Sequence, residues 1–116
     1  MKENLDIVKS LTRDLRDDKE SPRMPRETLA GYALAARAVD KCRAVLVGWE
    51  GEYISNCPLD QRWLRFAGVD YEAFKSVVAT GATDEEIAHW IGEHARNRLK
   101  TEIDEWNKRE GGVRIS

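Results

Sequence analysis

Four charged side chains follow one another closely in a segment that is otherwise rich in alanine: Arg37, Asp40, Lys41 and Arg43. Wound as a helix at 100° per residue, they fall in one sector, opposite an apolar one. The positions between them are mostly alanines, so long charged side chains stand around a floor of small ones. Arginine and lysine bind carboxylates and phosphates, and an aspartate can orient a guanidinium. This sector is therefore predicted to form a shallow anion-binding crevice.

Residues on either side of this helix are predicted to complete the crevice. Arg23 and Arg26 precede it, and we expect one of them to help Arg37 and Lys41 hold a carboxylate or phosphate. Tyr53 follows the helix in a loop and could hydrogen-bond a ligand held over this face. The predicted ligand-binding residues are thus Arg23, Arg26, Arg37, Asp40, Lys41 and Tyr53.

Two other interpretations of the same face stay open. In the first it is a solvated surface, with Arg37–Asp40 and Asp40–Arg43 pairs at three-residue spacing, each worth about a few tenths of a kcal/mol. In the second it docks a partner protein or a second copy of the chain, because small side chains allow a neighbouring helix to approach. A ligand-binding module and a protein-interaction module are therefore both open hypotheses.

An enzymatic role is a third alternative, with Asp40 and Lys41, or Cys57 and His94, as the reacting pair. Cys57 precedes Pro58 at a predicted helix start, where the helix dipole can stabilise a thiolate. A packed small hydrophobe is the competing interpretation of Cys57. His94 is expected on the buried side of its helix, where a hydrogen-bonded core residue is the commoner role. Neither pair has a sequence signature, so the sequence leaves open whether the protein is an enzyme.

Metal and cofactor chemistry have no support in the sequence. Glu86, His89 and Glu93 resemble half of a di-metal carboxylate site, but they point away from the apolar stripe of their helix and no second half is present. No phosphate-binding loop, dinucleotide fingerprint or nucleophile elbow occurs. We therefore predict no metal and no cofactor.

Composition narrows the class of protein. The chain has 116 residues, 34% charged and 41% hydrophobic, with a net charge of −2, which suits one domain spanning residues 1–116. No apolar run is long enough for a membrane span, and the N-terminus lacks the apolar stretch of a signal peptide, so a cytoplasmic protein is expected. Two cysteines are too few for a disulfide framework. The near-neutral total argues against nucleic-acid binding.

The neutral total conceals an uneven distribution of charge. Residues 22–49 hold five basic and two acidic side chains, a local +3. Residues 51–116 hold nine basic and twelve acidic side chains, a local −3. An anionic partner is therefore expected to meet the first half of the chain.

The elements that must position these residues are predicted to be helices. Capping residues begin two of them, Asp70 and the capping box of Thr83 and Glu86, and Gly68 ends another. Residues 52–55 form a short irregular loop, because a lone strand would have no partner. The prediction is an all-α, compact single-domain bundle of about five helices, over residues 5–15, 27–47, 58–67, 71–79 and 84–109.

The chain also resembles a known family at several motifs. These are Pro22-Arg23-Met24-Pro25-Arg26-Glu27, Arg37-Ala38-Val39-Asp40-Lys41-Cys42-Arg43, Cys57-Pro58-Leu59-Asp60 and Phe66-Ala67-Gly68-Val69-Asp70. Together they are similar to the small bacterial family catalogued as domain of unknown function 5069. The resemblance covers about residues 21–95, leaving an N-terminal helix or arm (1–20) and the end of a long C-terminal helix with a short tail (96–116). It implies a compact helical domain and carries no catalytic residue and no substrate.

Overall fold

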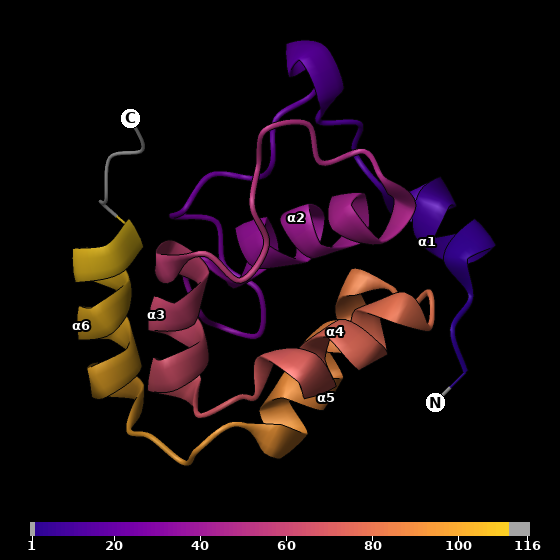
Figure 1. Ribbon diagram of the computed structural model, residues 1–116. Helices are drawn as coiled ribbons and strands as arrows, with labels where there is room; N and C mark the ends of the chain where they lie inside the picture. Colours follow the sequence, from indigo (N-terminus) through magenta and orange to yellow (C-terminus); the bar gives the residue numbers. More distant parts are fainter. Residues whose placement is uncertain (1, 112–116) are drawn as a thin grey trace.

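The computed structural model of the protein describes residues 2–111, which form six α-helices, one 3-10 turn and no strand (Figure 1). The all-α prediction is confirmed, with one helix more than the expected number of about five. None of the helices within residues 2–111 is both long and apolar enough to cross a membrane. The helices are α1 (Leu5–Leu11), α2 (Ala35–Val47), α3 (Pro58–Ala67), α4 (Tyr71–Ala79), α5 (Asp84–His94) and α6 (Lys100–Gly111), with the 3-10 turn at Arg16–Asp18.

The extra helix arises at the C-terminal end. The prediction of a single helix over residues 84–109 is wrong, because two helices, α5 and α6, occupy this part of the chain. The chain turns to an extended conformation at Ala95, with ψ of 156°. The Arg96 amide then donates to the Ala67 carbonyl oxygen at 2.8 Å, and Arg98 Nε donates to the Phe66 carbonyl oxygen at 2.8 Å. These contacts satisfy the last carbonyl groups of α3, so they compete successfully with helix continuation. Figure 1 shows the result, with α6 lying beside α3.

The central helix α2 begins at Ala35, eight residues later than the predicted start at residue 27. Ala30 and Leu34 have positive φ angles of 54° and 71°, which break a right-handed helix. The Leu34 amide instead donates to the Pro25 carbonyl oxygen at 2.8 Å. The segment before α2 is therefore a looped arm, although its alanines and leucines favour a helix.

Helix α2 lies at the centre of the molecule and is buried around most of its circumference. Its apolar side chains join a core around Trp63 and Phe74, both at most 1% exposed. Its charged side chains are buried as well, at exposures of 7% for Arg37, 3% for Asp40, 3% for Lys41 and 5% for Arg43. The interpretation of this sector as a solvated face, and the premise that it is open to a docking partner, are thus wrong. The chain itself covers the sector.

The segments that flank α2 form this cover. The arm before α2 and the loop after it arch over the same side of the helix (Figure 1). They are joined where the Leu15 amide donates to the Trp49 carbonyl oxygen at 3.0 Å. Two cations contact the Trp49 ring: Lys9 Nζ lies 5.3 Å from its centre and the Arg16 guanidinium carbon 5.1 Å. Cation–π attraction therefore helps fix the 3-10 turn over α2.

The predicted helix ends are confirmed where they depend on local contacts. Thr83 and Glu86 form the capping box, and the Asp70 carboxylate accepts from the Ala73 amide. Gly68 ends α3 with φ of 73°, and the next amide, that of Val69, returns to the Leu64 carbonyl oxygen at 2.8 Å. Residues 52–55 are irregular, as predicted.

Gly51 lies close to the backbone of Leu15 and Arg16, and its replacement by alanine is expected to destabilise the fold. A Cβ there would lie 2.7 Å from the Leu15 carbonyl oxygen, at a φ of +58°. We expect a loss of about 2 kcal/mol in the free energy of unfolding, measured by urea denaturation. Gly48→Ala is the matched control, because its φ is +77° but no atom lies within 4 Å, so it should lose about 1 kcal/mol. Equal losses for the two variants would contradict the close approach.

Candidate functional site

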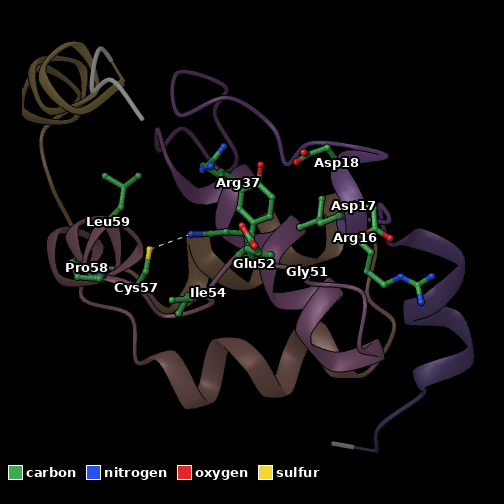
Figure 2. Close-up of a pocket in the computed structure, with 13 residues that line it drawn as sticks. Arg16, Asp17, Asp18, Arg37, Gly51, Glu52, Ile54, Cys57, Pro58 and Leu59 are labelled. Carbon is green, nitrogen blue, oxygen red and sulfur yellow. Dashed lines mark hydrogen bonds between the residues drawn. The ribbon is translucent and has the colours of Figure 1, made fainter. Parts of the chain in front are cut away.

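A hollow lies where the 3-10 turn and the loop after α2 meet the charged side of α2 (Figure 2). Its volume is about 910 Å³, enough for a small metabolite. We call it the Arg37 cavity, and its wall includes Arg37 and Lys41 from α2 and Tyr53 and Cys57 from the following loop. The N-terminal side of the wall comes from Leu15 and the 3-10 turn. Three segments far apart in sequence therefore build one cavity.

Arg37 is the unusual group in this cavity. Arg37 is only 7% exposed, and its side chain has no carboxylate partner among residues 2–111. One of its nitrogens, Nη1, donates to the Arg23 carbonyl oxygen at 3.2 Å, and its guanidinium carbon lies 5.7 Å from the centre of the Tyr53 ring. Its Nε has no hydrogen-bond partner within the described residues. A buried cation without a counter-ion is costly, so it indicates a site for an anion.

Lys41, one helical turn further along α2, is already paired. Its Nζ lies 3.0 Å from Asp60 Oδ1 and donates to Cys57 Sγ at 3.1 Å. Lys41 is 3% exposed and Asp60 is 2% exposed, which makes this a buried ion pair. The second carboxylate oxygen of Asp60, Oδ2, has no partner within residues 2–111. Lys41 therefore adds positive potential to the cavity wall while being held in place by α3.

Acidic side chains line the mouth of the cavity. Asp17, Asp18 and Glu52 are all exposed, whereas Arg37 and Lys41 of the wall are buried. Arg16, the third cation of the lining, is bound to Asp14 at 2.8 Å, and this hydrogen bond holds the pKa of Asp14 well below its usual range. The charge of Arg37, without a carboxylate partner among residues 2–111, thus lies in a cavity whose exposed lining is acidic.

Asp40 belongs to a different cluster, on the other flank of α2. Its Oδ2 accepts from the Arg23 amide at 2.7 Å and from Arg23 Nε at 3.1 Å, and its Oδ1 accepts from Arg23 Nη2 at 3.0 Å. Arg23 also reaches Asp84 at 2.7 Å, and Arg43 lies 3.0 Å from the same carboxylate. This network fastens the arm to α2 and to the start of α5. The Arg37–Asp40 and Asp40–Arg43 pairs of the solvated-face interpretation do not form.

The structure divides the predicted ligand-binding residues into three groups. Arg37, Lys41 and Tyr53 share the Arg37 cavity. Arg23 and Asp40 line a second hollow of about 550 Å³, where they bind each other. The remaining residue, Arg26, is exposed and lines neither hollow.

The pairs considered for an enzyme are also separated. Asp40 and Lys41 have different partners, Arg23 and Asp60, on different flanks of α2. His94 is exposed, contrary to the prediction of a buried position, and its Nδ1 lies 2.9 Å from the Trp90 carbonyl oxygen. The described contacts of Cys57 are with Lys41 and not with a histidine.

Asp60 is the site residue that sequence reasoning missed. Its place in the first turn of α3 suggested only an interaction with the helix dipole. In the structure it is the counter-ion of Lys41. No spacing in the sequence signals this contact, because the two residues lie on different helices.

No metal-binding cluster occurs within residues 2–111: His, Cys, Asp and Glu side chains do not gather there in groups of three or more that could hold an ion. His89 instead lies 2.9 Å from Glu93 on the exposed face of α5.

The Asp84 carboxylate makes the stability of the fold depend on pH. Partial burial acts to raise its pKa, but Arg23 and Arg43 outweigh this, so the pKa of Asp84 lies below its ordinary value. Its stabilising effect is therefore complete above the unfolded pKa of about 3.9 and is lost as the pH falls through the lower folded pKa.

We expect Asp84→Asn to be less stable than the wild type at pH 6 and to lose less stability on acidification, measured by urea unfolding. Glu85→Gln, at the exposed neighbouring position, should retain the wild-type profile; identical Asp84→Asn and wild-type profiles would contradict this role.

The family model described as "Domain of unknown function (DUF5069)" matches residues 19–113. No curated protein matches the chain.

Proposed function

Since the chain belongs to the DUF5069 family of domains of unknown function, we propose a function from the site itself: the Arg37 cavity binds a small anionic molecule. The ligand carries a carboxylate or phosphate group, which the Arg37 guanidinium receives. Lys41 adds positive potential, and the Tyr53 ring lies beside the guanidinium.

The observation that carries this proposal is the state of Arg37. Arg23 from the arm and Arg43 from α2, which belong to the cluster on the other flank of α2, both bind the Asp84 carboxylate. Arg37 is buried to a similar degree as Arg43, yet among residues 2–111 its guanidinium contacts a carbonyl oxygen and an aromatic ring and no carboxylate. An anion in the cavity would supply the missing counter-ion and accept from Nε.

The shape and charge of the cavity favour a small ligand over a polyanion. Its acidic rim, which includes Asp17 and Asp18, would repel a nucleic-acid backbone. A small molecule that passes this rim meets the cationic wall. The rim therefore disfavours a large polyanion more than a small anionic molecule.

A thermal-shift panel tests the proposal. Inorganic phosphate, phosphate monoesters and small carboxylates are added singly at constant ionic strength, so that general salt effects cancel. A ligand present at about 100 times its dissociation constant stabilises by about 2.7 kcal/mol, which raises the melting temperature of a chain this size by about ten degrees. We expect at least one class of anion to do so. A panel in which no anion raises the melting temperature would overturn the proposal.

A further inference from the structure

The Cys57 sulfur lies on the wall of the Arg37 cavity beside a cation, at a helix start. The Lys41 ammonium donates to Sγ at 3.1 Å, the contact drawn in Figure 2. Cys57 is the N-cap of the ten-residue helix α3, and its side chain makes no capping hydrogen bond. The ammonium and the amides of the first turn both stabilise negative charge on sulfur. These contacts make the sulfur a candidate nucleophile.

The second observation is the buried Arg37, whose side chain lines the same cavity and whose Nε has no hydrogen-bond partner within the described residues. Arg37 and Lys41 are four residues apart on α2, so their Cβ atoms lie about 6 Å apart on one helix face. An anionic group bound by Arg37 would therefore leave the rest of a small molecule within reach of the sulfur beside Lys41. The cavity combines a receptor for the anion with a group able to attack its carbon skeleton.

We propose that Cys57 is a nucleophile and that the cavity takes small carboxylates or phosphates bearing an electrophilic carbon. This inference rests on the proposed function, because Arg37 must hold the anionic group. In the reaction the thiol proton passes to water, and the sulfur electron pair forms a bond to the carbon. The leaving group departs with the electron pair of the bond that breaks. No histidine takes part, which distinguishes this arrangement from the Cys57–His94 pair.

The other cysteine provides an internal control. Cys42 is 0% exposed, and burial raises the pKa of its thiol to about 12. It is therefore protonated at neutral pH and inaccessible to reagents in the folded protein. Alkylation of the native chain should give a single adduct, on Cys57, which Cys57→Ser removes.

Two alkylating reagents test the proposal on the wild-type protein. Iodoacetate and iodoacetamide share the same carbon and the same leaving iodide, but only iodoacetate carries a carboxylate. We expect Cys57 to react with iodoacetamide about tenfold faster than a free cysteine peptide at pH 7, where only a few per cent of a free thiol is ionised. We also expect its iodoacetate-to-iodoacetamide rate ratio to exceed that of the peptide about tenfold, because Arg37 binds the carboxylate. Intact-mass spectrometry gives both rates.

Two variants separate the contributions. Arg37→Met should lower the rate ratio to that of the peptide, because the carboxylate of iodoacetate then has no guanidinium to bind. Arg43→Met, which removes an arginine outside the cavity, should keep the raised ratio. The wild-type comparison itself needs neither variant to fold.

The failures can be told apart. If Cys57 reacts no faster than the peptide with either reagent, the nucleophile is overturned, even where anions still bind at Arg37 and the proposed function holds. If Cys57 reacts rapidly with iodoacetamide but the rate ratio equals that of the peptide, the anionic substrate class is overturned. Loss of anion binding in the thermal-shift panel would then place the failure in the proposed function.

Discussion

Replacing Lys41 by methionine is expected to lower the free energy of unfolding by about 3–5 kcal/mol, because it leaves Asp60 as a buried charge without its counter-ion. The Asp60 Oδ2 atom already lacks a partner within the described residues, so no second group there takes over the role of Lys41. Urea denaturation at pH 7 measures the loss. A double variant, Lys41→Met with Asp60→Leu, should recover most of it, since both charges are then removed.

A lysine on the surface provides the matched control for this prediction. Lys100 lies 3.1 Å from Asp104, but their side chains are 88% and 51% exposed. Lys100→Met should therefore cost well under 1 kcal/mol, because solvent screens the pair. Similar losses for Lys41→Met and Lys100→Met would contradict the buried ion pair that fixes the cavity wall.

Replacing Arg37 by methionine is expected to weaken anion binding about 100-fold while leaving stability within about 1 kcal/mol of the wild type. Binding falls because the guanidinium is the receptor for the anionic group. Stability changes little because the variant loses one hydrogen bond, to the Arg23 carbonyl oxygen, but also removes an uncompensated buried charge. Titration calorimetry with the anion selected by the thermal-shift panel measures the first effect, and urea denaturation the second.

Arg43→Met should show the opposite pattern. Arg43 is buried and binds Asp84 and the Ala82 carbonyl oxygen, but it does not line the Arg37 cavity. We expect it to lose stability and to retain the wild-type affinity for the anion. If Arg37→Met destabilised the fold as strongly as Arg43→Met and left the affinity unchanged, Arg37 would be a structural residue.

The sequence predicted the features of the fold that depend on neighbouring residues. The capping box of Thr83, the N-cap at Asp70 and the start of α3 after Cys57 all involve contacts within one helical turn. The late start of α2 and the break at Ala95 could not be predicted in this way. Both depend on hydrogen bonds between segments, from Leu34 to Pro25 and from Arg96 to Ala67, which periodicity does not encode.

The candidate site was predicted only in part, because the sequence indicates contacts within one helix but not contacts between segments. Helical spacing placed Arg37 and Lys41 on one face of α2, and both line the cavity. Helical spacing could not distinguish the role of Arg37 from that of Asp40. The two roles differ because the arm places the Arg23 side chain against Asp40 and the Arg23 carbonyl oxygen against Arg37. Asp60 was missed because its partner lies on another helix. Charged residues on a central helix indicate a site, but only tertiary contacts show which of them lacks a partner.

The Nε–H group of Arg37 offers the most direct test that this guanidinium is an anion receptor. In a ¹H–¹⁵N spectrum of arginine side chains, its resonance is assigned by its absence from Arg37→Met. We expect this resonance to move in a saturable manner as the selected anion is titrated at constant ionic strength, while that of Arg43 stays in place. An Arg37 resonance that does not respond, under conditions where the anion binds the protein, would contradict the account.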